Sequence, residues 1–317
     1  MSSTRAPSRG RSQKRRAVPS EEQLVFSFLA PSQPEPSNEQ TSLESTREST
    51  RESALDELIP RKLSLEDLSS THIGEVERLA WELGFEHLVG VDEAGRGPWA
   101  GPVVAAAVLL PPNAALPPAL RSLNDSKQLN EAQREALFEP IISYALATGV
   151  GVATPQQIDQ VNILQATFYA MRAALCELWQ SAPRALHQAS SKSPKSALLL
   201  IDGKAPLPLQ QEELTAEEQL NAEVLSCLAS LNAHPQRSLI KGDARSLSIA
   251  AASVLAKVTR DRFMVTEAAR FPGYGFERHK GYGTAQHQEA LRRLGPCESH
   301  RLSFKPIKAL LIPSQEP

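Results

Sequence analysis

The sequence VDEAGRGPWAGP, residues 91–102, joins two apolar segments, residues 87–90 and 103–110, which both have the composition of buried β-strands. It places two adjacent carboxylates, Asp92 and Glu93, where the first strand is expected to leave the core. Carboxylates held on a rigid backbone are ligands that divalent cations prefer. The stretch therefore predicts a metal site at the end of a strand.

A glycine-rich loop, Gly95-Arg96-Gly97, follows the two acids directly. Because glycine has no side chain, the backbone of such a loop can approach a ligand closely, and we expect a sugar or phosphate to dock there. The simpler alternative is a solvent-facing acidic pair followed by a turn. Successive strand residues also point to opposite faces, so Asp92 and Glu93 share a site only if the strand ends or bulges at them.

The rest of the chain alternates between strand-like and helix-like segments, which predicts an α/β fold with a mixed sheet flanked by helices and a helical C-terminal region. The expected strands are 87–91, 102–110, 149–153, 197–201 and 237–241, and the expected helices are 71–85, 131–146, 162–179, 212–231, 246–270 and 284–294. Asn130 is a predicted helix cap, and Pro140 inside the same helix predicts a kink or a split.

Two further acids follow predicted strands. Asp202 ends the strand 197–201, and Asp243 follows the strand 237–241. In open α/β sheets ligands bind at strand ends, and carboxylates crowded together repel one another unless a cation lies between them. Each acid also has a simpler explanation, because Asp202 is followed by glycine in a common turn pair and Asp243 could cap the next helix. Together with Asp92 and Glu93 they favour Mg²⁺ or Mn²⁺.

Several basic and aromatic side chains are candidates for substrate contacts. Lys127 lies in a polar loop, and Ser253 and Lys257 share one face of the long predicted helix. Tyr282 lies between two glycines, where it could stack on a sugar or a base. Two alternatives stay open: Lys257 could pair with Asp261 one turn further on, and Tyr282 could fill the core.

The cysteines and three of the histidines do not have the spacing of zinc ligands. These residues are Cys176, Cys227, Cys297, His279, His287 and His300. We expect the histidines to make packing or surface contacts, and the odd number of cysteines without an export signal predicts reduced thiols in a cytoplasmic protein. The chain has no apolar run of membrane-spanning length. A net charge of −2 excludes a globally basic nucleic-acid binder, so any such contact needs a local patch.

The first 70 residues are predicted to be a disordered, low-complexity tail, because they are rich in Ser, Pro, Gln, Glu and Arg and poor in apolar residues. Within them, residues 1–18 carry six Arg and Lys side chains and no acid. Such an arm is typical of loose attraction to polyanions, although a solvated tail with no partner explains it equally well. Residues 71–317 are expected to form the catalytic domain.

The motifs of the chain, taken together, resemble those of type 2 ribonuclease H, the bacterial ribonuclease HII family. The segments that carry the resemblance run in order from about residue 87 to residue 306: VDEAGRGPWAGPVVAAAVLL, LNDSKQLNEAQREALF, IDQVNILQATFYAMRAAL, LLIDGKAPLP, IKGDARSLSIAAASVLAKVTRDR, FPGYGFERHKGYGTAQHQEAL and GPCESHRLSFKP. Several long motifs in one order make the resemblance specific.

The resemblance implies a ribonuclease H-like fold and endonucleolytic hydrolysis of RNA in RNA–DNA hybrids. It also implies incision at single ribonucleotides embedded in duplex DNA, with 3′-hydroxyl and 5′-phosphate ends, and two Mg²⁺ or Mn²⁺ ions once substrate is bound. No membrane partner is implied, and we expect a monomer.

The resemblance also assigns roles to residues. The catalytic and metal-binding carboxylates it implies are Asp92, Glu93, Asp202 and Asp243, and the substrate-binding residues it implies are Gly95, Arg96, Gly97, Lys127, Lys257 and Tyr282. The glycine loop and Tyr282 would sense the ribose 2′-hydroxyl, the group that separates RNA from DNA. The two lysines would lie near the phosphates.

The chain departs from the family pattern in the long tail and in the stretch between Asp202 and Asp243, where residues 212–231 look like an insertion. One alternative is the related ribonuclease HIII, which would bring an extra folded N-terminal domain and a different residue after the glycine of the DEAG motif. Another is a catalytically silent nucleic-acid-binding domain. A silent binder would bind the duplex without cutting it at any concentration of Mg²⁺ or Mn²⁺.

Overall fold

The computed structural model describes residues 73–112, 116–182, 196–210, 214–219 and 221–311. The predicted tail and its basic arm lie outside these residues, as do residues 183–195. The side chains of residues 124–128, which include Lys127, also lie outside the described part. No helix in the described ranges is both long enough and apolar enough to cross a membrane.

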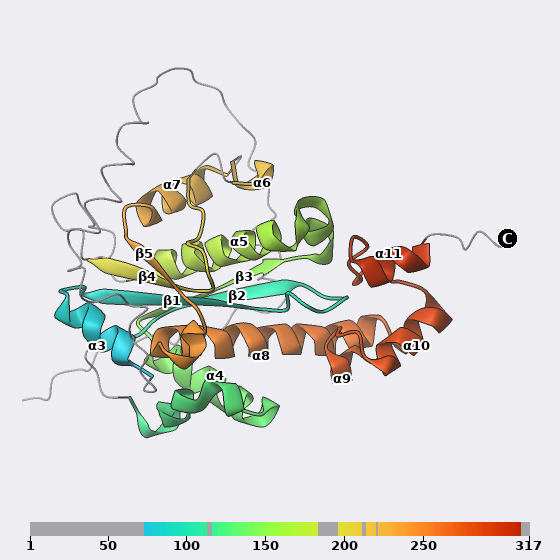
Figure 1. Ribbon diagram of the computed structural model, residues 1–317, viewed down its shortest axis with the longest axis horizontal. Helices are drawn as coiled ribbons and strands as arrows, with labels where there is room; N and C mark the ends of the chain where they lie inside the picture. The colour runs from blue at the N-terminus through green and yellow to red at the C-terminus, as the bar shows by residue number, and fades with distance from the viewer. Residues whose placement is uncertain (1–72, 113–115, 183–195, 211–213, 220, 312–317) are drawn as a thin grey trace, which may run out of the picture. The chain divides into compact units, whose positions relative to one another are not determined.

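One mixed sheet of five strands forms the centre of the fold, in the order β3-β2-β1-β4-β5 (Figure 1). The strands are β1 (His87–Ala94), β2 (Val103–Leu109), β3 (Ala147–Ala153), β4 (Ala197–Asp202) and β5 (Gln236–Leu239). The ladders β1–β2 and β2–β3 are antiparallel, whereas β1–β4 and β4–β5 are parallel. The predicted mixed sheet with flanking helices is confirmed.

Two long helices cover the two faces of this sheet (Figure 1). Helix α5 (Pro155–Ser181) packs on β3 and β2, and helix α8 (Leu247–Arg270) packs on β1 and β2 from the other side. The approach of α5 requires glycine in β3. A Cβ atom at Gly149 would lie 2.1 Å from the carbonyl oxygen of Ala174, and one at Gly151 would lie 2.0 Å from that of Ala170.

Two predicted helix starts are confirmed by caps. Asn130 forms a capping box with Gln133 at the start of α4 (Glu131–Tyr144), which continues through Pro140 without the predicted split. Thr284 caps α10 (Ala285–Leu294). Helix α5 begins earlier than predicted and is interrupted at Asn162, whose φ of 74° is non-helical and whose side chain accepts from the amides of Leu164 and Gln165.

Several predicted boundaries were wrong. The first helix, α3 (Glu75–Glu82), is shorter than 71–85, and the single helix expected at 212–231 is two helices, α6 (Ala216–Gln219) and α7 (Ala222–Leu231). Two short helices, α9 (Phe276–His279) and α11 (Lys305–Leu311), were not predicted, although both lie in the region expected to be helical. Short elements of one or two turns have too few residues to show a period.

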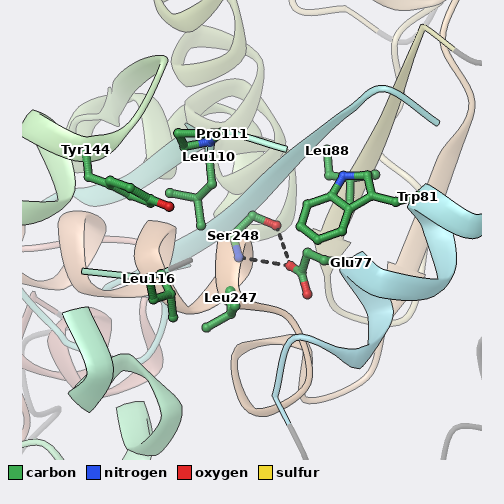
Figure 2. A pocket seen from close by; sticks show the side chains of 9 residues that line it. All are labelled: Glu77, Trp81, Leu88, Leu110, Pro111, Leu116, Tyr144, Leu247 and Ser248. Carbon is green, nitrogen blue, oxygen red and sulfur yellow. Dashed lines mark hydrogen bonds between the residues drawn. The ribbon is translucent and has the colours of Figure 1, made fainter. Parts of the chain in front are cut away.

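Helix α3 is attached to the start of α8 through Glu77. Its buried Oε1 accepts hydrogen bonds from Ser246 Oγ (2.6 Å), Ser248 N (3.1 Å) and Ser248 Oγ (2.9 Å). Figure 2 shows the hydrogen bonds between Glu77 and Ser248 beside a pocket that Trp81 and mainly apolar side chains from other segments also line. The contact fixes the N-terminal turn of α8, the helix that passes beneath the acidic strand end.

Candidate active site

The acidic pair lies where the sheet loses one of its ladders. Strand β1 pairs with β2 in continuous register as far as Ala94, but its pairing with β4 stops at Val91 opposite Ile201. The prediction that the strand ends before the acids is therefore wrong for the ladder with β2, which continues past them. It is right for the ladder with β4, which ends before them. Asp92 and Glu93 remain in a regular strand, and only their β4 side is open.

Three carboxylates meet at this open side. Oxygen atoms of Asp92, Glu93 and Asp202 all lie within 4.8 Å of one another. Asp202 is the last residue of β4, one position past the final β1–β4 pair. Asp92 turns toward its neighbour, because its Oδ1 accepts a 2.7 Å hydrogen bond from the amide of Glu93. Consecutive residues thus share one site without a bulge.

The electrostatics of the cluster favour a bound cation. Burial raises the pKa of Asp92 well above its usual value, and the charges of Glu93 and Asp202 raise it further. Burial also raises the pKa of Glu93, although the nearby Arg96 guanidinium, 3.0 Å away, opposes the shift. Oε2 of Glu93 is buried and has no hydrogen-bond partner in the described part of the protein. Three crowded carboxylates with an unsatisfied oxygen fit a hard divalent ion that takes oxygen ligands.

The residue before Asp243 contacts the cluster through its backbone. Asp243 lies in the 3₁₀ turn η4 (Gly242–Ala244), and the amide of Gly242 donates a 2.6 Å hydrogen bond to Oδ1 of Asp202. The carboxylate of Asp243 is not among the three within 4.8 Å of one another. The alternative role of Asp243 as cap of the following helix is wrong, because Ser246 caps α8.

Helix α8 runs along the site and contributes three polar side chains at intervals of about one turn. Ser253 hydrogen-bonds to the carboxylate of Asp92. Lys257, one turn later, pairs with Asp261 at 2.8 Å, so the simpler reading of this lysine is confirmed. Arg260, three residues further along the helix, donates to the carbonyl oxygens of Pro102 (3.0 Å) and Ala100 (3.1 Å).

The glycine loop and Tyr282 meet in space although 185 positions separate Gly97 from Tyr282 in the sequence. A Cβ atom at Gly97 would lie 3.8 Å from Cε1 of Tyr282 and would meet nothing else within 4 Å. The tyrosine is 46% exposed, so the alternative that it fills the core is wrong. We call this meeting point the Gly97–Tyr282 junction.

Arg301 is the main residue of this region that sequence reasoning missed. Its side chain is fully buried and donates four hydrogen bonds to carbonyl oxygens, two of them in the glycine loop: Gly95 (2.6 Å) and Arg96 (3.0 Å). The other two acceptors are Gly101 (2.9 Å) and Pro102 (3.1 Å). The GPCESHRLSFKP motif contains this arginine, but nothing in the local pattern indicates that it reaches the loop.

The three histidines pack together as expected, and they are buried. The rings of His279 and His287 stack with centroids 4.5 Å apart, and Nε2 of His287 lies 3.0 Å from Nε2 of His300. Burial lowers the pKa of both His287 and His300 to about 4. They belong to no metal-binding group found among the described residues.

Comparisons with known proteins identify the family of the chain. The family model described as Ribonuclease HII matches residues 89–197 and 217–307. The match includes most of 212–231, so that segment is not the insertion predicted; the unmatched stretch is 198–216. Among curated relatives, the Ribonuclease HII of Syntrophotalea carbinolica is 47% identical over 72% of this chain and 90% of its own length. That of Geobacter metallireducens is 43% identical over 78% of this chain and 97% of its own length.

A solved structure shares the fold. The crystal structure of Bst-RNase HIII in complex with Mn²⁺ is 22% identical, covers 73% of this chain and 71% of its own, and has a TM-score of 0.51. The similarity extends the agreement from sequence motifs to the arrangement of strands and helices.

Proposed function

Since this chain belongs to the ribonuclease HII family, and is therefore a ribonuclease H that cleaves RNA in RNA–DNA hybrids, we propose that it also incises at single ribonucleotides embedded in duplex DNA. We further propose that hydrolysis breaks the P–O3′ bond, so that water adds to phosphorus and the products carry 3′-hydroxyl and 5′-phosphate ends. The observation that carries the proposal is the meeting of Asp92, Glu93 and Asp202, with Arg96 of the glycine loop 3.0 Å from Glu93.

In this proposal Asp92, Glu93, Asp202 and Asp243 are the catalytic carboxylates and the ligands of Mg²⁺ or Mn²⁺, two ions when substrate is present. Bound ions would neutralise the carboxylates and stabilise charge on the scissile phosphate. Asp243 would act with the other three carboxylates because the preceding residue, Gly242, already donates its amide to Asp202. Ser253 would keep Asp92 turned toward the other acids.

Recognition of the ribose rests on the junction. The carbonyl and amide groups of Gly95, Arg96 and Gly97 can contact a 2′-hydroxyl because no side chain at Gly95 or Gly97 keeps the substrate away. The exposed ring of Tyr282 would pack on the adjacent sugar. We propose that Lys127 and Lys257 lie near the phosphates, Lys257 through the ammonium group that now pairs with Asp261.

The test is incubation with a labelled duplex that carries one ribonucleotide, with and without Mg²⁺ or Mn²⁺, followed by mapping of the nick and its ends. We expect a metal-dependent nick at the ribonucleotide and none in the all-DNA duplex. Binding without cleavage at every metal concentration would instead support a catalytically silent binding domain.

A further inference from the structure

We propose that His300 and Arg301 are positioning residues that hold the two sides of the Gly97–Tyr282 junction in register and so determine how well the protein distinguishes ribose from deoxyribose. The inference rests on the proposed role of the junction in sensing the 2′-hydroxyl. Neither residue needs to touch the substrate, because each acts through a neighbour that does.

Arg301 holds the glycine-loop side. Its guanidinium donates to the carbonyl oxygens of Gly95 and Arg96, and also to those of Gly101 and Pro102, where the loop returns to β2. Four of its five N–H groups are therefore used on one short segment. Any shift of the loop would break several of these bonds together, so the loop has one preferred position.

His300 holds the tyrosine side through His287. Nδ1 of His287 donates to the carbonyl oxygen of Tyr282 (2.9 Å), which leaves its Nε2 as an acceptor. Nδ1 of His300 accepts from the amide of Cys297 (2.9 Å), which leaves its Nε2 as the donor to His287 (3.0 Å). The partners thus fix both tautomers, and the relay ends on the backbone of Tyr282.

The two connections start from adjacent residues, so a single peptide unit joins them. The backbone supports the same arrangement. The Arg301 amide donates to the Trp99 carbonyl (2.9 Å), and the Trp99 amide donates to the Gly281 carbonyl (2.8 Å), one residue before Tyr282. Ala100 and His300 also form an isolated β-bridge. The junction is therefore closed by a short ring of contacts.

The choice of arginine supports a positioning role. Arg301 and Arg260 are both fully buried, and within the described residues their guanidinium groups donate hydrogen bonds to main-chain carbonyl oxygens. Burial lowers the pKa of Arg301 to about 9 and that of Arg260 to about 10. A buried charge is costly unless it is hydrogen-bonded, so the side chain depends on the geometry of its carbonyl acceptors. A lysine in its place has three donors on one atom and cannot span four separate carbonyls.

The experiment measures discrimination in binding. In an Asp92→Asn background, which should not cleave, the Kd for an all-DNA duplex is divided by the Kd for the same duplex with one ribonucleotide. We expect Arg301→Lys to lower this ratio at least tenfold, mainly by weakening ribonucleotide binding. Arg172→Lys is the matched control, because Arg172 is equally buried but pairs with Glu218 between α5 and α6. It should lower the melting temperature and leave the ratio within twofold.

Two further variants separate positioning from general destabilisation. His287→Asn keeps a donor near the Tyr282 carbonyl but loses the bond to His300, so it should also lower the ratio. In a Tyr282→Ala background, His287→Asn should change the ratio no further, because the tyrosine through which it acts is gone, whereas Arg301→Lys should still lower the ratio through the glycine loop. Tyr282 is exposed, so its removal should not unfold the protein.

The outcomes distinguish the two proposals. A parent protein that shows no preference for the ribonucleotide duplex would overturn the proposed sensing role itself. A parent that discriminates, with Arg301→Lys and His287→Asn folded and equally discriminating, would overturn the positioning role alone. If Arg301→Lys does not fold, the discrimination ratio of His287→Asn alone tests the positioning role, and an unchanged ratio overturns it.

Discussion

The amide of Gly242 donates a 2.6 Å hydrogen bond to Oδ1 of Asp202, which joins the ends of two strands at the acidic cluster. The contact brings the turn that carries Asp243 next to the last residue of β4. The proposed role of Asp243 depends on this contact, because its carboxylate lies outside the 4.8 Å group of the other three acids.

Asp92→Asn should abolish cleavage while leaving the Kd for a ribonucleotide duplex within about threefold, because the amide cannot replace the carboxylate as a charged metal ligand. It should also raise the melting temperature of the metal-free protein, since it removes a buried charge that Glu93 and Asp202 repel. Mn²⁺ should raise the melting temperature of the wild type more than that of the variant. Thermal melts and cleavage assays check these results, and retained turnover would remove Asp92 from the site.

Two glycine substitutions should have opposite effects. Gly151→Ala should destabilise the fold by about 2–4 kcal/mol, because its Cβ would lie 2.0 Å from the Ala170 carbonyl oxygen of α5. The activity of the protein that remains folded should be unchanged. Gly97→Ala meets nothing closer than 3.8 Å and should leave the melting temperature within about 2 °C, yet it should impair cleavage at a ribonucleotide. Equal loss of stability in both variants would contradict this assignment.

Acidic pH should lower the stability of the C-terminal region, because two of its buried histidines then become protonated. The pKa values of His287 and His300 are lowered to about 4 from a usual 6.5, so the unfolded state binds more protons between those values. The stabilisation is complete above pH 6.5 and is lost as the pH falls toward 4, by about 3 kcal/mol for the first histidine protonated. Urea unfolding from pH 7.5 to 4.5 measures the loss. His287→Asn should flatten the profile in this window, and an unchanged profile would exclude the pair as its cause.

Deletion of residues 1–18 should weaken binding to duplexes mainly at low salt. The arm carries six basic side chains and no acid, and phosphate contacts of this kind release counterions. Binding titrations at several salt concentrations should show a shallower salt dependence for the shortened protein. If the affinities are equal at low salt, the arm does not contact this substrate.

The sequence predicted the parts of the site that follow from strand order. Apolar runs followed by acids placed Asp92, Glu93 and Asp202 at strand ends, and parallel pairing of β1 with β4 brings those ends together. It mispredicted how Asp92 and Glu93 share a site, because the end of one ladder and the continuation of the other depend on the relative lengths of β2 and β4. That comparison involves residues about a hundred positions apart.

The supporting side chains could not be predicted from local pattern. Arg301 reaches the glycine loop across more than 200 positions, and an arginine followed by leucine and serine usually signals a surface. The histidines at 279, 287 and 300 become neighbours only because α9 and α10 fold against the final loop. For Tyr282 the sequence left a core role and a substrate role open, and its exposure excludes the core role.

The early end of β4 has a consequence for how this protein tolerates changes in length. Two residues added inside β4 would extend the parallel ladder alongside Glu93 and cover the open side of the carboxylates with main chain. A phosphodiester could then no longer reach them. The same addition directly after Gly203, where a Cβ atom would meet nothing within 4 Å, would leave the ladder and the open side of the carboxylates unchanged. The stretch 198–216, which the family model does not match, contains both positions, and we expect insertions there to preserve activity after Gly203 and to abolish it within β4.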